Sequence, residues 1–350
     1  MKSELLEALE QIEKEKGVCK DTLIEAIEAA LITAYKKNFG SAQNVKITID
    51  RENGEVHVYS RKQVVENVDN DLLEISLEDA KKINPNYEIS DFVEKEVTPK
   101  NFGRIAAQTA KQVVVQRIRE AERAVIYEEF VNRESEIVTG TIQRISKGIV
   151  YINLGKTEAL LLPNEQIKNE VYTQGTRIKT YIVEVKKTTK GPQVLVSRTH
   201  PGLVKRLFEL EVPEIHDGIV EIKGISREAG SRTKIAVYSS NPNVDPVGAC
   251  VGQRGSRVQN IVEELRGEKI DIIKWSEDPA EFISNSLSPS KVEKVEINDA
   301  NKSALVIVPD YQLSLAIGKE GQNARLAAKL TNWKIDIKSE TQHENAEANE

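Results

Sequence analysis

The chain of 350 residues is 39% hydrophobic and 30% charged, and its formal net charge at pH 7 is −6. At about 150 residues per domain, this length predicts two to four domains, and the composition is that of a folded protein. No segment approaches the roughly 18 apolar residues that span a bilayer, and the charged N-terminus does not resemble a signal sequence, so we expect a cytoplasmic protein with no membrane partner.

Residues 1 to 133 are predicted to form one α+β domain that begins with two helices. The first carries an apolar stripe that includes Leu5 and Ile12. The second starts at a capping box, in which Thr22 precedes Glu25 by three residues. Both helices are therefore expected to pack one face against the rest of the domain.

The remainder of this domain changes its hydrophobic period twice. Alternating apolar residues over 45 to 58, with Asn53-Gly54 between them, predict a β-hairpin. A short helix is expected after Ser76, and a long one from Thr98-Pro99 to about Arg133. The predicted apolar face of the long helix consists of residues spaced by three or four: Ala106, Ala110, Val114, Ile118, Ala121 and Val125.

Residues 134 to 200 contain five short strand-like runs and no convincing helix. Five strands in about 65 residues suit a closed barrel of the OB type, although a plain β domain would show the same alternation. This segment has 10 basic and 6 acidic residues, whereas each other segment has more acidic than basic ones. Its cationic cluster, at one predicted hairpin, is expected to contact RNA phosphates: Lys186, Lys187 and Lys190.

An internal repeat follows the barrel. The sequence ACVGQRGSRVQNIVEELRGEKIDI at 249–272 matches LAIGKEGQNARLAAKLTNWKIDI at 315–337, and two strand-like runs precede each copy. The order helix, strand, strand, helix, GxxG, helix, strand is thus predicted twice. We expect one unit over 201–278, a second over 279–344, and a disordered tail over 345–350, where the sequence is polar and without period.

A GxxG turn between two helices has a specific chemistry. Glycine lets a second backbone approach closely, and the amides at the start of the next helix attract phosphate. This is the mechanism by which KH domains clamp a four-nucleotide single strand. One such turn alone is weak evidence, because any helix hairpin can use glycine at its turn, but here both copies keep a cationic residue. The predicted RNA-binding residues are Gly252, Gln253, Arg254, Gly255 and Arg257, and Gly318, Lys319, Glu320, Gly321 and Arg325.

Catalytic and metal-binding motifs are not found in the sequence. Cys19 and Cys250 form no CxxC pair, and the four histidines lack ligand spacing. There is no GxSxG, GxGxxG or GxxxxGK[ST] motif. We therefore expect no catalytic residue, no metal and no cofactor. Trp275 and Trp333 are interpreted as packing residues.

The chain as a whole resembles the NusA family of bacterial transcription elongation and termination factors. Four runs carry the resemblance: NFGRIAAQTAKQVVVQRIREAE at 101–122, GIVYINLGKTEALLLPNEQI at 148–167, VGACVGQRGSRVQNIVEEL at 247–265 and LAIGKEGQNARLAAKL at 315–330. The resemblance implies a multidomain α+β protein with an N-terminal RNA-polymerase-binding domain, an OB-type barrel and two tandem KH domains. It implies as partners RNA polymerase, single-stranded nascent RNA and other elongation factors, and a role in pausing, termination and antitermination.

The barrel departs from related RNA-binding barrels. Many of these carry an aromatic residue or histidine on the RNA face of the second and third strands, where this sequence offers Tyr151. Tyr151 is equally well interpreted as a packing residue, so RNA binding by the barrel alone stays open. Two alternative functions stay open: a ribosome-associated RNA-binding protein, and an RNA-degradation component, which would place a KH unit before the barrel.

Overall fold

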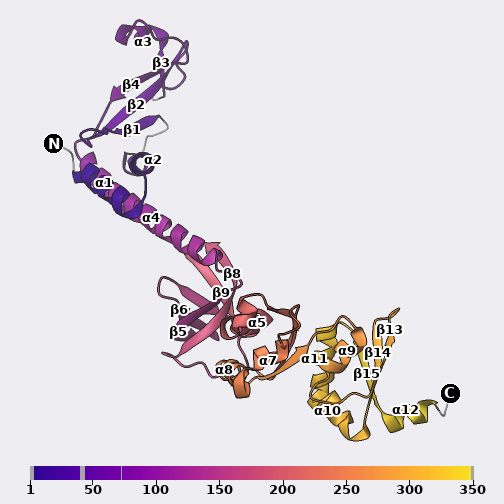
Figure 1. Ribbon diagram of the computed structural model, residues 1–350. Coiled ribbons are helices and arrows are strands. Elements are labelled where there is room, and N and C mark those ends of the chain that lie inside the picture. The colour runs from indigo at the N-terminus through magenta and orange to yellow at the C-terminus, as the bar shows by residue number, and fades with distance from the viewer. Residues whose placement is uncertain (1–3, 40–43, 72, 348–350) are drawn as a thin grey trace. The chain divides into compact units, whose positions relative to one another are not determined.

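The computed structural model describes residues 4–39, 44–71 and 73–347 (Figure 1). The chain divides into two compact units, Met1–Val125 and Ile126–Glu350. The predicted mixture of helices and strands is confirmed in both.

The first unit combines four helices with a four-stranded sheet. The sheet has the order β1-β2-β3, and β4 pairs with the long strand β2. The predicted hairpin is confirmed, because Ile49 of β1 lies opposite Val56 of β2 in an antiparallel pair. The elements are α1 (Glu4–Lys16), α2 (Lys20–Phe39), β1 (Val45–Ile49), β2 (Val56–Val65), β3 (Glu74–Ser76), α3 (Leu77–Ile83), β4 (Phe92–Glu96) and α4 (Phe102–Val131).

Helix ends in this unit follow local chemistry. The predicted helix after Ser76 is confirmed, and the Ser76 hydroxyl oxygen caps it by accepting a 3.2 Å hydrogen bond from the Asp79 amide. Helix α2 begins at Lys20, two residues before the expected capping box at Thr22. Neither β3 nor β4 was predicted, because β3 has three residues and β4 buries only Val93 among charged neighbours.

The core of the first unit corrects one expectation about α4. Ala106 and Ala110 are buried against α1, α2 and the hairpin, as predicted, and Val114 packs against the same cluster. Val125, assigned to the same apolar face, is 62% exposed. An apolar period predicts burial only where another element lies opposite, and α4 extends beyond the core that covers its first turns.

The second unit begins with a closed five-stranded barrel of order β5-β6-β7-β9-β8, in which only β7 and β9 pair in parallel. All five predicted strands are present. An added Cβ at Gly140 would collide with the Ile152 side chain, which explains a glycine in the middle of β5. The strands are β5 (Ile137–Ser146), β6 (Ile149–Asn153), β7 (Glu158–Leu161), β8 (Arg177–Thr188) and β9 (Gly191–Ser197), with a 3-10 turn η1 (Pro163–Glu165).

The predicted repeat is confirmed as two similar αβ units. In each, an antiparallel strand pair is extended by a parallel third strand that follows the GxxG turn. The first unit consists of α5 (Pro201–Glu211), α6 (Pro213–His216), β10 (Val220–Glu228), β11 (Arg232–Ser239), α7 (Pro246–Val251), η2 (Gln253–Gly255), α8 (Ser256–Glu264) and β12 (Lys269–Lys274). The second consists of α9 (Pro279–Ser286), β13 (Lys294–Asn298), β14 (Ser303–Val308), η3 (Asp310–Gln312), α10 (Leu313–Ile317), η4 (Lys319–Gly321), α11 (Gln322–Thr331) and β15 (Lys334–Ser339).

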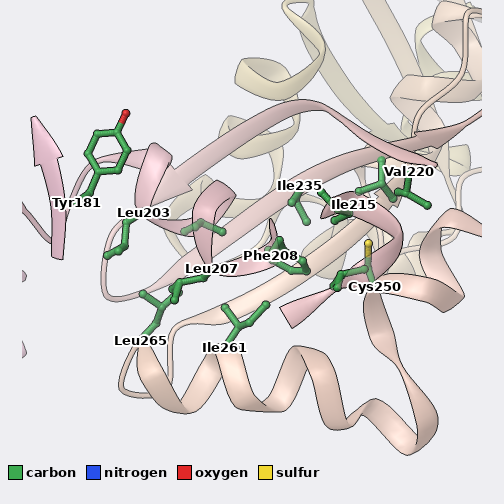
Figure 2. Close-up of a cluster of buried hydrophobic side chains, with 13 residues drawn as sticks. Tyr181, Leu203, Leu207, Phe208, Ile215, Val220, Ile235, Cys250, Ile261 and Leu265 are labelled. Atoms are coloured by element: carbon green, nitrogen blue, oxygen red, sulfur yellow. The ribbon is translucent and has the colours of Figure 1, made fainter. Parts of the chain in front are cut away.

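Both faces of the first repeat's sheet are covered. On one face, Phe208 of α5 and Ile261 of α8 pack on strand residues such as Ile235 (Figure 2). On the other face, Ala236 and Ile273 pack against Phe282 of α9, with Trp275 and Leu330 at the edge. Helices of the second repeat thus complete the first, and the prediction that Trp275 is a packing residue is confirmed. Trp333 likewise packs against the core of the second repeat.

The buried side chain of Arg198 joins the barrel to the first repeat. Arg198, whose side chain is 0% exposed, donates two hydrogen bonds to the Glu170 carboxylate, at 2.6 and 3.1 Å. It also donates to the carbonyl oxygens of Lys179 in β8 and Glu264 in α8. A planar guanidinium with this many partners fixes direction as well as distance, so β8 and α8 are held in one orientation.

The predicted disordered tail needs a correction. Residues 345–347 belong to a helix, α12 (Glu340–Glu347), while 348–350 lie outside the described residues. The helix is attached at its start, where the Thr341 hydroxyl donates to Asp310 at 2.6 Å and Gln342 accepts from the Ser339 amide. Polar composition alone did not reveal these contacts.

Candidate nucleic-acid interface

The two GxxG turns have the same backbone conformation. Gly252 (φ 74°, ψ 179°) and Gly318 (φ 76°, ψ 170°) lie in a region that essentially only glycine occupies. Two residues later, Arg254 (φ 53°) and Glu320 (φ 54°) are left-handed, and each turn ends on a left-handed glycine. Because both turns have the same unusual backbone conformation, we infer that they share one function.

The atoms around the first glycine of each turn, as well as its backbone torsion angles, exclude a larger residue. A Cβ at Gly318 would lie 2.8 Å from both the backbone nitrogen and the Cβ of Asn323, and at Gly252 it would lie 2.7 Å from Cγ of Arg257. A Cβ at Gly321, the second glycine of its turn, would meet no atom closer than 3.9 Å. The first glycine therefore packs against the following helix, whereas the second leaves open space.

The side chain five residues after each first glycine holds the turn together. Arg257 donates from Nη1 to the Ala249 carbonyl at 2.6 Å and to Glu214 at 2.8 Å. In the other copy, buried Asn323 donates from Nδ2 to the Ala316 carbonyl at 3.0 Å and to that of Leu287 at 2.9 Å. Both side chains thus satisfy the end of the preceding helix, whose last carbonyls have no partner within that helix.

This arrangement revises the expectation for Arg257, which was predicted to contact RNA. Its Nη1 already donates the hydrogen bonds that support the loop, and its guanidinium forms an ion pair with Glu214. The structure therefore gives Arg257 a supporting role. Asn323 was not predicted; aligning the repeats from their first glycines places it opposite Arg257 and would have revealed it.

The exposed part of each turn suits a phosphate. Gln253, Arg254, Lys319 and Glu320 are exposed, and no described acidic residue forms an ion pair with either cation. Helices α8 and α11 each follow a glycine and so receive no side-chain cap from that residue. The first amide of each helix, on Ser256 and Gln322, already donates within the turn, to the carbonyl of Gln253 and Lys319 respectively. The positive end of each helix dipole, beside Arg254 or Lys319, still favours an anion.

Arg325, the remaining predicted contact, lies elsewhere on α11. Its Nε donates to Glu228 of β10 at 2.6 Å, and its Nη1 donates to the carbonyl of Glu320 at 3.1 Å. Glu228 also accepts from Gln322. Neither Glu228 nor Gln322 was identified from the sequence, because their partnership joins residues 94 positions apart.

The barrel lysines lie at the β8–β9 hairpin, as predicted, and all are exposed. Lys186 pairs with Glu184 at 2.9 Å, and Lys187 lies 4.3 Å from the centre of the Tyr127 ring. Such exposed contacts are weak and leave the ammonium groups available to phosphate.

Tyr151 has two interpretations, stacking on an RNA base or packing within the protein, and its surroundings bear on both. Arg144, its cross-strand partner, stacks on the ring with Cζ 3.5 Å from the centroid and also pairs with Glu158. One face of the ring is therefore already covered by a guanidinium. A base that approached this site would meet the exposed Arg144 as well as the partly exposed Tyr151.

Metal sites and membrane-spanning helices are both absent from the described residues. Among them, no three His, Cys, Asp or Glu side chains are grouped so as to hold a metal ion. Within the same ranges, no helix is long and apolar enough to cross a membrane.

A five-stranded barrel followed by two GxxG units defines a multidomain protein of the nucleic-acid-binding class. Family profiles agree, matching residues 132–197 (S1 RNA binding domain), 4–124 (NusA N-terminal domain), 198–275 (NusA-like first KH domain) and 279–345 (NusA-like second KH domain). The chain belongs to the NusA family.

Relatives match along nearly the whole chain. Transcription termination/antitermination protein NusA of Halalkalibacterium halodurans is 65% identical over 98% of this chain and 90% of its own length. The protein of the same name from Bacillus subtilis is 64% identical, over 97% and 92%. A solution structure of the N-terminal domain of the B. subtilis protein is 63% identical, covering 35% of this chain and 99% of that domain, with a TM-score of 0.32.

Proposed function

We propose that this protein is a non-enzymatic transcription factor of the cytoplasm that docks on RNA polymerase and holds the emerging RNA, thereby modulating pausing, termination and antitermination. The relatives, which are named as transcription termination/antitermination proteins, support a role in transcription. The observation that supports RNA binding most directly is the repeated loop geometry, in which an exposed cation, Arg254 or Lys319, lies beside the N-terminus of a helix. Further elongation factors are expected to join the complex.

The proposed RNA site consists of the two loops, Gly252–Gly255 and Gly318–Gly321. The glycines admit the sugar-phosphate backbone, the positive ends of the helix dipoles attract phosphate oxygens, and the cations add charge. Lys186, Lys187 and Lys190 form a second cationic cluster on the barrel. Because the loops belong to repeats joined without a flexible linker, a strand that spans both gains from a high effective concentration.

The experiment replaces Gln253, Arg254, Lys319 and Glu320 together by Asp in the full chain. Affinity for single-stranded RNA should fall more than about tenfold, because two cations are lost and new negative charge faces phosphate. The slope of log affinity against log salt should flatten by about 1.4, at roughly 0.7 per lost contact. Unchanged affinity in a folded variant would exclude the loops as the site.

A matched control replaces two exposed lysines outside the loops, Lys205→Asp and Lys302→Asp. This variant also loses two cations and lowers the net charge by four, against five for the loop variant, so it measures the effect of net charge. Its RNA affinity should decrease much less than that of the loop variant. Equal losses would mean that RNA responds to overall charge instead of to the loop geometry.

For polymerase docking, the first unit offers an apolar cavity of about 790 Å³ between α1, α4 and the β1–β2 hairpin. Ala8 of α1 and Ala107 of α4 line it and are exposed. An apolar concave surface of this size suits a protein partner. The combination Ala8→Arg and Ala107→Arg should weaken co-sedimentation with RNA polymerase and leave RNA affinity unchanged, whereas Ala29→Arg, on α2 outside the cavity, should have no effect. Capture of ribosomal particles in place of polymerase would support the ribosome-associated alternative.

A further inference from the structure

We propose that Glu228 of the first KH domain positions the RNA-binding loop of the second KH domain by holding Arg325 against the loop. The proposal rests on the RNA-binding function proposed above and extends it to a residue remote from the loops in sequence. It assigns Glu228 and Arg325 to positioning, without RNA contact.

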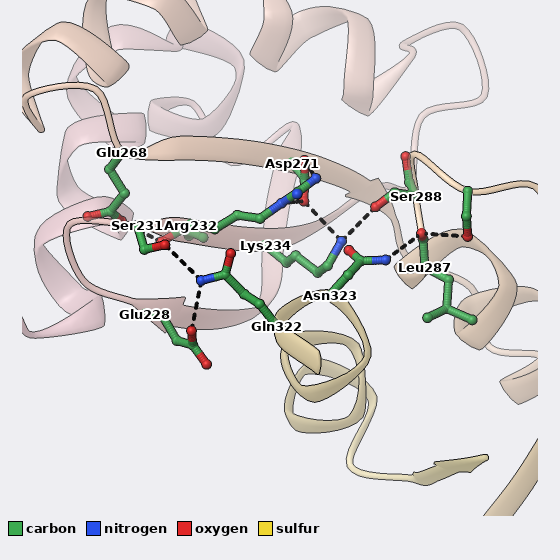
Figure 3. A network of polar contacts seen from close by, with 12 residues as sticks. Glu228, Ser231, Arg232, Lys234, Glu268, Asp271, Leu287, Ser288, Gln322 and Asn323 are labelled. Atoms are coloured by element: carbon green, nitrogen blue, oxygen red, sulfur yellow. Dashed lines mark hydrogen bonds and ion pairs between the residues drawn. The ribbon is translucent and has the colours of Figure 1, made fainter. Parts of the chain in front are cut away.

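The contacts form a continuous path between the two domains. Glu228, the last residue of β10, accepts hydrogen bonds from Arg325 Nε at 2.6 Å and from Gln322 Nε2 at 2.8 Å. Figure 3 shows Gln322 between Glu228 and Ser231. Gln322 also contacts the Ser231 hydroxyl at 2.8 Å. Since Gln322 is the first residue of α11, the first domain holds this helix where it leaves the loop.

The path ends within the loop itself. Arg325 donates from Nη1 to the carbonyl of Glu320, which is the left-handed residue of the second GxxG turn. A carbonyl fixed in this way fixes the adjoining peptide plane, and with it the direction of the next amide. The guanidinium therefore connects the orientation of a loop amide to a carboxylate on the other domain.

The first loop differs in this respect. Seven residues after its first glycine, where Arg325 stands in the second repeat, the first repeat has Gln259. Gln259 hydrogen-bonds Glu263 on its own helix, at 3.2 Å. Position 325 of the second repeat thus serves a contact that the corresponding position of the first repeat does not make.

Electrostatics support an ion pair that persists at neutral pH. The hydrogen bond from Arg325 lowers the pKa of Glu228, and the same bond raises the pKa of Arg325. The side chains are 25% and 46% exposed, so the pair is of the partly solvated kind whose strength is modest. Its role lies in geometry more than in overall stability.

If Glu228 positions the loop, Glu228→Gln should lower RNA affinity, whereas charge alone predicts that it raises RNA affinity. Glu228→Gln removes a negative charge near a phosphate-binding loop and frees Arg325, so simple electrostatics predict tighter RNA binding. If Glu228 positions the loop, affinity should instead fall, by about three- to tenfold, as expected for loss of one charge-assisted contact. The measurement is titration of the full chain with a single-stranded RNA long enough to span both loops.

Two further variants distinguish positioning of the loop from an effect of charge alone. Arg325→Lys keeps the charge but cannot bridge Glu228 and Glu320 with one planar group, so its affinity should fall by a similar factor. Glu221→Gln removes an exposed carboxylate from the same strand, β10, and should leave affinity within about twofold of wild type. Trp275 and Trp333 fluorescence checks that each variant is folded.

The outcomes are distinct from those that test the proposed function. If the four-residue loop variant binds RNA like wild type, the loops are not the site and the function proposed for them fails. If that variant loses binding while Glu228→Gln binds equally or more tightly, RNA recognition stands and the positioning role is overturned. Wild-type affinity in Arg325→Lys would likewise overturn it, because a phosphate contact needs only the charge.

Discussion

Alanine should be tolerated far less at Gly318 than at Gly321, although the two glycines lie three residues apart in one loop. At Gly321 (φ 73°, ψ 13°), alanine would be left-handed, at a cost of about 1 kcal/mol, and its Cβ would find space. At Gly318 (φ 76°, ψ 170°), the conformation is almost closed to other residues. The new Cβ would also lie 2.8 Å from the backbone nitrogen of Asn323, which cannot move without shifting α11.

These contributions give a total of about 3 kcal/mol or more for Gly318→Ala, against about 1 kcal/mol for Gly321→Ala. Gly321→Asn should cost still less, because asparagine tolerates the left-handed region. Gly252→Ala should fall between the extremes, since its Cβ would meet the flexible side chain of Arg257 instead of backbone.

The assay is urea unfolding of the full chain followed by tryptophan fluorescence. The two tryptophans of the chain, Trp275 and Trp333, both lie in the KH repeats, so the signal reports the region that contains the loops. Equal losses for Gly318→Ala and Gly321→Ala, or a larger loss at Gly321, would refute the steric reasoning.

Two further changes test buried charges. Arg198→Met leaves Glu170 buried without its partner and should cost about 3–5 kcal/mol in thermal unfolding followed by circular dichroism, whereas a loss below about 1 kcal/mol would contradict a tight junction. Burial raises the pKa of Glu268, but hydrogen bonds and charge from Arg227, with bonds from Thr233, outweigh it, so the folded pKa lies below the ordinary 4.5. This stabilisation is present above pH 4.5 and is lost as the pH falls through the folded pKa, so Glu268→Gln should be less stable at neutral pH and lose less stability on acidification.

Periodicity and turn chemistry predicted most elements of this fold. The barrel strands and the repeated GxxG units could be identified because alternation, glycine spacing and internal similarity are local signals. The strands β3 and β4 could not, because their few residues lack an apolar alternation. The exposure of Val125 also escaped prediction, since a helix pattern does not say where its partner ends.

Some residues of the candidate site could likewise be predicted from the sequence, and others could not. The loop residues follow from the motif, but the partners of Arg257 and Arg325 do not, because Glu214 and Glu228 come close only after the chain folds. An arginine beside a phosphate-binding loop has the same sequence signature whether it contacts RNA or supports the loop. Only the location of a carboxylate distinguishes these roles.

Helices α9 and α11 cover the sheet of the first KH domain, so the two domains stack like the units of a repeat protein. The contact is head-to-tail, with the sheet of one copy against the helices of the next, so this contact covers the first sheet and not the second. Helix α12 follows β15 much as α9 follows β12, and it packs on β14 and β15, where Ile307 is 5% exposed. Helix α12 thus lies on the second sheet as α9 lies on the first, but its polar sequence gives this cover a hydrophilic outer surface.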